Sequence, residues 1–270
     1  MKLPLEDTFA DILSKARRGL GIDVEAAAAE AGLSTMVANS VLGGNFDEPG
    51  VRALATVFGL APDRVAALGR GDYAPEEISL LDGLSQFNTP FDDMTVNSYL
   101  VWDPATKEAI AFDTGADATG MLEAIHEHAL TVRLILLTHS HGDHILELDR
   151  LVEKTGAPAY IGEKEPVEGA ESFAAGKTFS VGSLTIESRS TWGHSPGGIT
   201  YVVRGLSRTV AIVGDAIFAG SMGGGNISYQ DALQTNRENI LSLPEETVLC
   251  PGHGPLTTVG EQKQVNPFFP

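Results

Sequence analysis

Two patterns of hydrophobic residues divide the chain. Up to residue 70, apolar residues recur at helical spacing, as at Phe9, Ile12 and Ala16, and no run indicates a strand. From Phe87 onward, short apolar runs alternate with helical stretches and turn residues, which is typical of an α/β fold. We therefore predict a small all-α domain over residues 1–70, a linker over 71–86 and an α/β domain over 87–270.

Local signals place the elements. The predicted helices of the first part are 8–18, 24–31, 34–42, 51–58 and a fifth that begins at 61, with Ser34 as a cap and with Pro49 and Pro62 near helix starts. The predicted strands of the second part are 95–102, 109–112, 134–138, 159–161, 184–188, 199–203, 209–213 and 248–250. Its helices are predicted over 116–128 and 231–241.

The helices over 27–44, "AAAEAGLSTMVANSVLGG", and 48–68 resemble the Cro/repressor-type helix-turn-helix domain. In that family the second helix of the motif lies in the major groove of DNA. Here the helix over 34–42 contains no Lys or Arg, and residues 1–72 hold seven basic and ten acidic side chains. This charge disfavours nucleic acid as a partner. Two other roles stay open, covering the mouth of an active site or forming a homo-oligomer.

Charge and cysteine content limit the partners and the compartment. The chain has 36 acidic and 18 basic residues, a net charge of −18, so phosphate-rich or other polyanionic ligands would be repelled. Cys250 is the single cysteine, which excludes an internal disulfide and suits a reducing compartment. We find no secretory-signal pattern and no apolar run near the roughly 20 residues that span a bilayer. The expected location is the cytoplasm, without membrane contact.

Five of the seven histidines lie in loops that follow apolar strands. Three of them and one aspartate occur within six positions of "LTHSHGDH" (137–144), directly after the strand over 134–138. The others follow later strands, in "TWGHSPGG", "LCPGHGP" and, for the second aspartate, "TVAIVGD". The resulting candidates are His139, His141, Asp143, His144, His194, Asp215 and His253.

This spacing is suited to metal binding. Residues i and i+2 of an extended segment point the same way, so His139 and His141 can converge on one ion. Gly142 permits a turn after which Asp143 and His144 open a helix. Imidazole and carboxylate are ligands that Zn²⁺ prefers, and closed structural zinc sites are usually rich in cysteine, which this pattern lacks. We predict a reactive metal site at one edge of a sheet.

The ligand pattern resembles the metallo-β-lactamase-fold superfamily and, within it, the glyoxalase II-like hydrolases. The stretches "NSYLVWD", "AFDTGAD", "GHSPGGITYV", "GDAIFAGSMGG" and "LCPGHGP" carry the resemblance. It implies a four-layer αββα sandwich for residues 87–270 with two divalent ions at one edge, Zn²⁺ or alternatively Fe or Mn. It implies one ion on His139, His141 and His194, a second on Asp143, His144 and His253, and Asp215 bridging both. Asp113 of "FDTG" would support the site from behind.

The resemblance implies hydrolysis of a small thioester or ester, of the S-acylglutathione kind, by a hydroxide that bridges the two metals. Asp143 or Asp215 would orient this nucleophile. A thiolate leaves with little proton assistance, so the lack of an obvious general acid favours a thioester over an amide. Tyr160 and Lys164 are candidates for the lining of the substrate pocket. Glyoxalase II enzymes carry a C-terminal helical domain with basic residues for glutathione, whereas only 15 residues follow Pro255 here.

Two alternatives remain. A mononuclear iron persulfide dioxygenase resembles this family in its ligand motif, but such enzymes usually carry an Arg near the loop after the bridging aspartate. Here that loop reads "AIFAGSMGGGN" and contains no basic residue. The alternative of another class is a DNA-binding regulator with a metal-sensing domain, against which both the charge of the first domain and the intact nucleophile-generating ligand set argue.

Overall fold

A computed structural model describes residues 3–79 and 81–270 of the chain. Five helices occupy the first part: α1 (Phe9–Leu20), α2 (Val24–Glu30), α3 (Thr35–Leu42), α4 (Glu48–Val57) and α5 (Pro62–Arg70). Side chains of Thr8, Asp23, Ser34 and Asp47 accept backbone N–H bonds at the first turns of α1 to α4. These caps satisfy donors that a helix leaves free, which is why the predicted helices form where the sequence places them.

Most elements differ from their predicted bounds by a few residues: the strand predicted over 134–138 is Thr131–Leu136, and the helices predicted over 116–128 and 231–241 are Thr119–Glu127 and Tyr229–Asn239. Two further differences have an evident cause. Helix α4 begins at Glu48 rather than at residue 51, because Asp47 caps it and Pro49 fits its first turn. The first strand begins at Leu84, inside the predicted linker, and pairs with the next strand through Leu84 and Val101. The polar stretch that follows Leu84 hides this strand from a hydrophobic pattern. This strand forms because it pairs with the strand that follows it in the chain.

In the described part of the chain, twelve strands form two mixed sheets of six. The first sheet contains, in spatial order, β1 (Leu84–Phe91), β2 (Met94–Trp102), β3 (Glu108–Phe112), β4 (Thr131–Leu136), β5 (Ala159–Gly162) and β6 (Ala170–Phe173). The second contains β12 (Thr257–Thr258), β11 (Val248–Pro251), β10 (Val210–Gly214), β9 (Ile199–Arg204), β8 (Leu184–Ser190) and β7 (Thr178–Val181). Strands β3 to β6 run parallel, as do β10 and β11, and the remaining pairs are antiparallel.

Alternation along the strands creates a core on both faces of each sheet. Ile110 and Phe112 of β3 point between the sheets, where they meet residues such as Tyr201 of β9, whereas Ala109 and Ala111 face the outer helices. Strands buried on both faces read as nearly continuous apolar runs, which explains why the central strands were predictable from the sequence.

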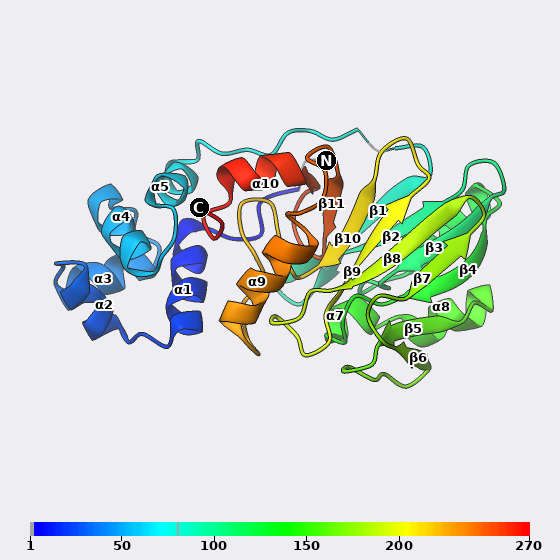
Figure 1. Cartoon of the computed structure of the whole chain (residues 1–270), viewed down its shortest axis with the longest axis horizontal. Helices are drawn as coiled ribbons and strands as arrows, with labels where there is room; N and C mark the ends of the chain where they lie inside the picture. The colour runs from blue at the N-terminus through cyan, green and yellow to red at the C-terminus, as the bar shows by residue number, and fades with distance from the viewer. Residues whose placement is uncertain (1–2, 80) are drawn as a thin grey trace.

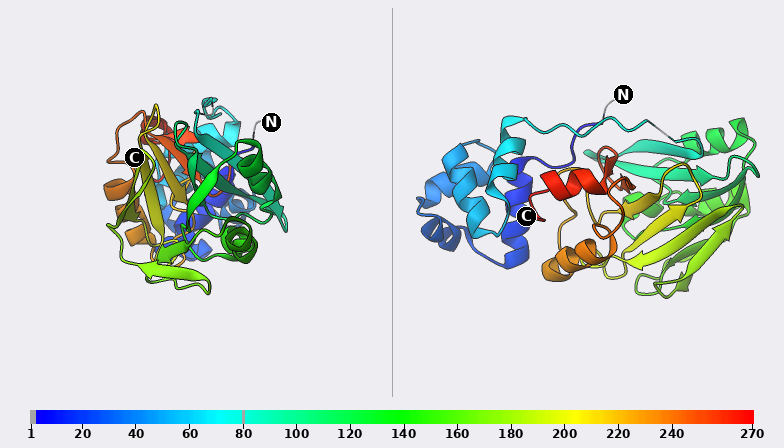
Figure 2. Two further views of the ribbon diagram at one scale, coloured as in Figure 1. Left: turned by 90° about the vertical axis from the view of Figure 1, so that its right-hand side faces the viewer. Right: turned by 45° about the horizontal axis from the view of Figure 1, so that its top comes forward.

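Helices cover the two outer faces, so the α/β domain is an αββα sandwich, as the resemblance implied (Figures 1 and 2). Residues of α6 (Thr119–Glu127) and α8 (Leu148–Thr155) pack on the first sheet. Residues of α9 (Tyr229–Asn239) and α10 (Val259–Val265) pack on the second. The short helix α7 (Gly142–Ile145) begins directly after His141. Within residues 3–79 and 81–270, no helix is long and apolar enough to cross a membrane.

The N-terminal helices share a core with the second sheet. Ile12 and Leu13 of α1 belong to the same buried cluster as Val202 and Ala211 of β9 and β10, together with Phe268 near the C-terminus. The C-terminal residues are also tied to α5 by polar contacts: the Ala61 N–H donates to the Pro267 carbonyl, and Arg64 donates to the carbonyls of Asn266 and Phe269. The helical region is therefore packed directly on the sandwich.

Candidate metal centre

The seven predicted ligands follow the carboxyl ends of four strands. The segment from His139 to His144 follows β4 of the first sheet, while His194, Asp215 and His253 follow β8, β10 and β11 of the second. The structure brings all seven to one edge of the sandwich, where they form two adjoining groups. His139, His141, His194 and Asp215 form one group, and Asp143, His144 and His253 form the other.

In the first group, Nδ1 of His141 lies 3.0 Å from Nε2 of His139 and 3.1 Å from Nε2 of His194. In the second group, Oδ2 of Asp143 lies 3.4 Å from Nε2 of His253 and 3.5 Å from Nε2 of His144. The first group thus offers four imidazole or carboxylate donors and the second offers three, and in each group the donors come from more than one loop. This is the donor chemistry that suits borderline divalent cations.

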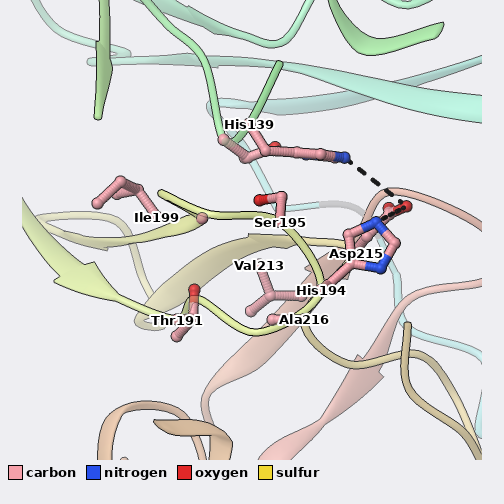
Figure 3. A pocket seen from close by; sticks show the side chains of 10 residues that line it. His139, Thr191, His194, Ser195, Ile199, Val213, Asp215 and Ala216 are labelled. Carbon is pink, nitrogen blue, oxygen red and sulfur yellow. Dashed lines mark hydrogen bonds and ion pairs between the residues drawn. The ribbon is translucent and has the colours of Figure 1, made fainter. Parts of the chain in front are cut away.

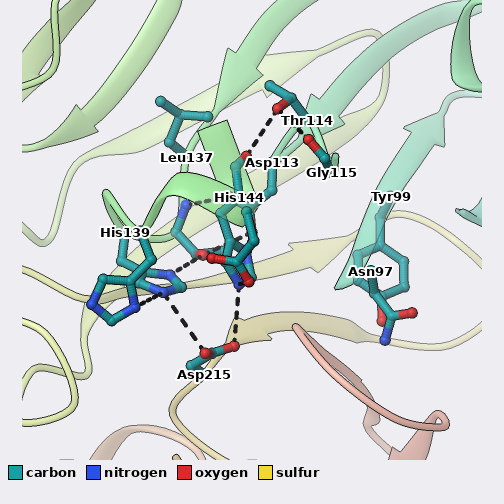
Figure 4. Close-up of polar contacts among 12 residues, drawn as sticks. Asn97, Tyr99, Asp113, Thr114, Gly115, Leu137, His139, His144 and Asp215 are labelled. Carbon is teal, nitrogen blue, oxygen red and sulfur yellow. Dashed lines mark hydrogen bonds and ion pairs between the residues drawn. The ribbon is translucent and has the colours of Figure 1, made fainter. Parts of the chain in front are cut away.

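Asp215, a member of the first group, also faces the second group, and Figure 4 shows its carboxylate beside His139 and His144. Its Oδ1 atom is 3.3 Å from Nε2 of His144, and its Oδ2 atom is 3.4 Å from Nε2 of both His194 and His253. One carboxylate therefore faces donors of both groups, the position expected of a ligand shared by two ions.

In four of the five histidines, the ring nitrogen that points away from the centre, Nδ1, contacts an oxygen atom of the protein that orients the ring. Nδ1 of His253 lies 2.7 Å from the Thr95 carbonyl oxygen, and Nδ1 of His194 lies 2.9 Å from that of Gly224. Because carbonyl oxygens only accept, these Nδ1 atoms carry the protons and leave Nε2 free to face the centre. His139 and His144 have corresponding contacts, at 3.0 Å to Thr138 Oγ1 and 2.8 Å to Asp113 Oδ2. Such contacts orient metal ligands and fix their tautomer.

Asp113 supports the site as the resemblance implied. Besides His144, it accepts hydrogen bonds from the backbone N–H and the hydroxyl of Thr138, at 2.7 and 2.8 Å. Its backbone has a φ of 54°, in the left-handed region that is uncommon for residues other than glycine. Three hydrogen bonds hold it there, and they join β3 to the loop that carries His139.

Buried charges of both signs balance each other in this cluster. Burial alone would lower the pKa of His144, but the carboxylates of Asp215 and Asp113 outweigh it and raise the pKa to about 10. Burial likewise opposes a proton on His253, yet Asp215 and Asp143 raise its pKa to about 11. Asp215 is buried, which favours its neutral form, but His253 and His144 hold its pKa well below the ordinary value. The carboxylates thus favour positive charge at this cluster, which bound divalent cations would supply.

The donors fit divalent cations. Among the described residues, His144 Nε2 and Asp215 Oδ1 are buried and have no hydrogen-bond partner, although they face each other. Unsatisfied buried polar atoms are costly, and a cation between them would satisfy both. Burial and the neighbouring His144 lower the pKa of His139 well below the usual range, which keeps this imidazole neutral and able to bind a metal.

Glu165 is a side chain beside the metal-ligand loops that the sequence analysis missed. Its Oε2 atom accepts from the Ser140 N–H at 2.7 Å and from the Ser140 hydroxyl at 2.8 Å, while Oε1 accepts from the Gly197 N–H at 2.6 Å. Ser140 stands between His139 and His141, and Gly197 follows three residues after His194. The buried Glu165 carboxylate therefore ties together the two loops that supply three imidazoles.

Side chains of β2 hold the loop of His253 by hydrogen bonds, and Gly252 allows this loop to approach the ligands closely. The side-chain amide of Asn97 donates to the carbonyls of Pro251 and Gly254, and the Tyr99 hydroxyl donates to Pro251 as well. A Cβ atom on Gly252 would overlap Asp215 Oδ1 and lie 2.6 Å from Cε1 of His144. Gly252 thus allows the backbone of one loop to touch ligands carried by two others.

A cavity of about 10 Å³ adjoins His139, His194 and Asp215, with Thr138, Thr191 and Ser195 among its other lining residues (Figure 3). A single water molecule needs about this much room, so a substrate must approach from the solvent side of the cluster.

Tyr160 and Lys164, which were predicted to line a substrate pocket, contact aromatic side chains. The ring of Tyr160 packs 5.4 Å from that of Phe179, with the Lys177 ammonium 4.5 Å above it. The Lys164 ammonium lies 5.5 Å from the ring of Trp192. These are packing contacts, and a role in substrate binding stays a prediction.

Among known proteins, the chain is similar to "Probable metallo-hydrolase YqgX" of Bacillus subtilis, with 32% identity over 207 residues that cover 67% of this chain and 95% of that protein. It is 27% identical to "Hydroxyacylglutathione hydrolase GloC" of Haemophilus influenzae, over 64% of this chain and 92% of that protein.

Solved structures with the same fold include BLEG-1 B3 metallo-beta-lactamase, at 29% identity and a TM-score of 0.59 over 68% of this chain and 99% of that one. ETHE1 from Myxococcus xanthus has 25% identity and a TM-score of 0.59, over 68% of this chain and 83% of that one. The fold and its His/Asp groups imply divalent metal ions. The family profile matches residues 91–253, and the chain belongs to the Metallo-beta-lactamase superfamily.

Proposed function

We propose that this protein is a metal-dependent hydrolase of a small thioester or ester, similar in chemistry to glyoxalase II, that uses two divalent ions. The observation that carries the proposal is the position of Asp215 between two groups of donors, 3.3 Å from His144 and 3.4 Å from both His194 and His253. A pair of ions held there would polarise the substrate carbonyl and supply a water of lowered pKa.

The chain's own residues would order this reaction. His139, His141 and His194 would hold one ion, and Asp143, His144 and His253 the other. The Asp143 and Asp215 carboxylates lie next to each other across His253, so either can accept a hydrogen bond from the attacking water and orient it. In the overall reaction the water oxygen forms the new C–O bond, and the C–S or C–O bond to the leaving group breaks. Of the two protons of the water, one ends on the departing thiol or alcohol and the other is released to solvent as the carboxylate product forms.

Two observations support a thioester as the substrate. The relative GloC is named a hydroxyacylglutathione hydrolase. Glu165, Asp113 and the Thr95 carbonyl are each engaged in holding a ligand loop, so these groups are not free to protonate a poor leaving group. A thiolate leaves without such help. We propose Zn²⁺ as the metal because imidazole and carboxylate donors suit it, with Fe or Mn as alternatives.

A mononuclear iron persulfide dioxygenase is the second candidate. The loop after Asp215 contains no basic residue of its own, but α1 brings Lys15 to it, where the ammonium donates to the Met222 carbonyl at 3.0 Å. This ammonium is also paired with Asp7, so it is already engaged within the protein. Because Lys15 is engaged in this way and because Asp215 faces both groups of donors, we favour the hydrolase.

Metal analysis combined with two assays tests the proposal. Purified protein should contain about two divalent ions per chain and should release thiol from S-lactoylglutathione or a similar thioester. Chelation should abolish the hydrolysis, and Zn²⁺ should restore it. One iron per chain together with oxygen uptake on glutathione persulfide, and no thioester hydrolysis, would transfer the assignment to the dioxygenase.

A further inference from the structure

Residues near the start of the chain lie against the metal centre, although the family match begins only at residue 91. Gly254 follows His253 directly, and a Cβ atom built on Gly254 would lie 3.3 Å from the Glu6 backbone nitrogen, 3.5 Å from the Pro4 carbonyl oxygen and 3.6 Å from Cβ of Glu6. We call residues 4–7 the N-terminal strap. In Figure 1 this segment, in blue, runs past the end of β11 before it enters α1.

The strap is anchored on its other side to the loop that follows Asp215. Oδ2 of Asp7 accepts hydrogen bonds from the Ser221 hydroxyl and from the Lys15 ammonium, which also donates to the Met222 carbonyl. The Asp7 and Lys15 side chains are only 7% and 15% exposed. Paired and hydrogen-bonded charges at this level of burial hold a fixed geometry. The strap is thus fastened to the site loop.

Two further contacts connect this anchor to His253, one of the predicted metal ligands. The Lys15 ammonium lies 5.1 Å from the centre of the Phe218 ring, and that ring stands edge-on to the imidazole of His253 at 5.7 Å. The strap, the loop after Asp215 and the loop of His253 therefore pack together beside the second group of donors.

Glu6 occupies the position in the strap between these two loops. It is partly buried, and this burial is the main reason why its pKa is raised, while the charge of His253 lowers it and the charges of Asp7 and Asp215 raise it further. Cβ of Glu6 lies beside Gly254, the residue that follows His253, so the side chain starts at the edge of the His253 loop. Asp7 is neutralised by Lys15, and Glu6 contributes a negative charge to this side of the site.

We propose that the N-terminal strap forms part of the rim of the metal centre and that Glu6 selects among substrates by charge. It disfavours thioesters or esters that carry a carboxylate on the His253 side and favours those whose corresponding group is neutral or cationic. This inference rests on the proposed hydrolase function. Its physical basis is repulsion between like charges in a partly buried site, where screening by water is weaker than at the surface.

The experiment compares two thioesters of the same acyl group in the metal-loaded, full-length protein. S-Lactoylglutathione carries carboxylates on its thiol part, whereas the lactoyl thioester of N-acetylcysteamine is neutral. Glu6→Gln should raise kcat/KM for the glutathione thioester by about tenfold and change that for the neutral thioester by less than twofold. Glu6→Lys should move the ratio further in the same direction, and 0.5 M salt should reduce the effect.

The matched control is Glu30→Gln, which removes the same charge from an exposed position on α2 in the same helical region. It should leave both kcat/KM values unchanged. If wild type hydrolyses both thioesters and both Glu6 variants keep the wild-type ratio, charge selection by Glu6 is overturned while the hydrolase function stands. Equal changes for the two substrates would overturn it as well. If metal-loaded wild type hydrolyses neither thioester, the proposed function fails and the inference fails with it.

Discussion

The substitution Glu165→Gln is the sharpest test of how the ligand loops are held. The Glu165 carboxylate receives three hydrogen bonds, two from Ser140 and one from Gly197, and all three partners are donors. Glutamine has nearly the same shape, but one of its two terminal atoms is itself a donor. If the amide oxygen keeps the contacts with Ser140, the NH₂ group faces the Gly197 N–H, and that buried donor loses its partner.

The expected loss follows from this single mismatch. A buried polar group left unsatisfied costs about 1–3 kcal/mol. Because the mismatch separates the loop of His139 and His141 from the loop of His194, we expect the loss to appear mainly in metal binding. A free energy of this size corresponds to roughly a 5- to 150-fold weaker affinity. We expect a similar fall in kcat/KM when metal is limiting.

Metal affinity is measured by competition with a chelator, and unfolding temperatures are compared with and without metal. The control is Glu163→Gln, the same chemical change two residues earlier at an exposed position. Positioning of ligands predicts that Glu165→Gln loses more stability in the metal-loaded protein than in the metal-free protein. Equal losses in the two states, with unchanged metal affinity, would show that Glu165 contributes only to packing and would refute the argument.

Three further substitutions test other parts of the structure. Asp215→Ala should abolish turnover and reduce metal content, as measured by elemental analysis; full metal content with wild-type hydrolysis would disprove its shared role. Gly252→Ala should reduce metal affinity, because the methyl group would overlap Asp215 and crowd His144, and it should cost stability by about 1–3 kcal/mol in urea unfolding. Asp103→Asn should lower the urea midpoint at pH 6. Backbone N–H groups of Ser183 and Ala105 hold the pKa of Asp103 at about 2, below the ordinary 3.8, so its contribution is present above pH 3.8 and lost as the pH falls towards 2. A gap from wild type that did not narrow below pH 4 would contradict this assignment.

The candidate ligands could be found from the sequence because each lies in a short segment with its own signal. His139 to His144 follow an apolar strand within six positions, and His194, Asp215 and His253 each stand beside a glycine after another strand. Strand ends in a layered α/β fold meet at one edge, so local patterns were enough to predict that these side chains converge. The helices of the first 70 residues were predictable for a similar reason, since the side-chain caps of α1 to α4 and the proline that opens α5 are local signals.

Elements with weak local signals were missed. Strands β6 and β7 are four residues long, β6 shows no alternation of buried and exposed positions, β7 alternates only over its four residues, and β12 has two residues. Helices α8 and α10 contain few buried apolar residues. Partners fix such elements more than their own sequence does, as the pairing of Leu84 with Val101 fixes the start of β1. The division into separate domains at residues 70 and 87 stays a prediction.

Glu165 and the N-terminal strap show a different limit. The stretch "GEKEP" contains two glutamates separated by one lysine, and nothing local distinguishes the buried Glu165 from the exposed Glu163. Glu165 differs from Glu163 because it accepts hydrogen bonds from two loops that are distant in the sequence, one at Ser140 and one at Gly197. A local sequence pattern does not reveal such a tertiary contact.

The packing of the helical region changes how its resemblance to DNA-binding domains is understood. Helix α1 shares a buried cluster with the second sheet, and its Lys15 is held by Asp7 and by the carbonyl of Met222 in the loop after Asp215. A recognition domain that docks on DNA needs a free basic surface, whereas α3 has none and α1 uses Lys15 within the protein. The same contacts would transmit any displacement of the helical region to the rim of the metal centre. The helical region therefore packs on the sandwich beside the candidate metal centre, and the residues just before α1 lie against the loop of His253. If Glu6 selects substrates as proposed, a substitution at residue 6 should alter which substrates the site accepts.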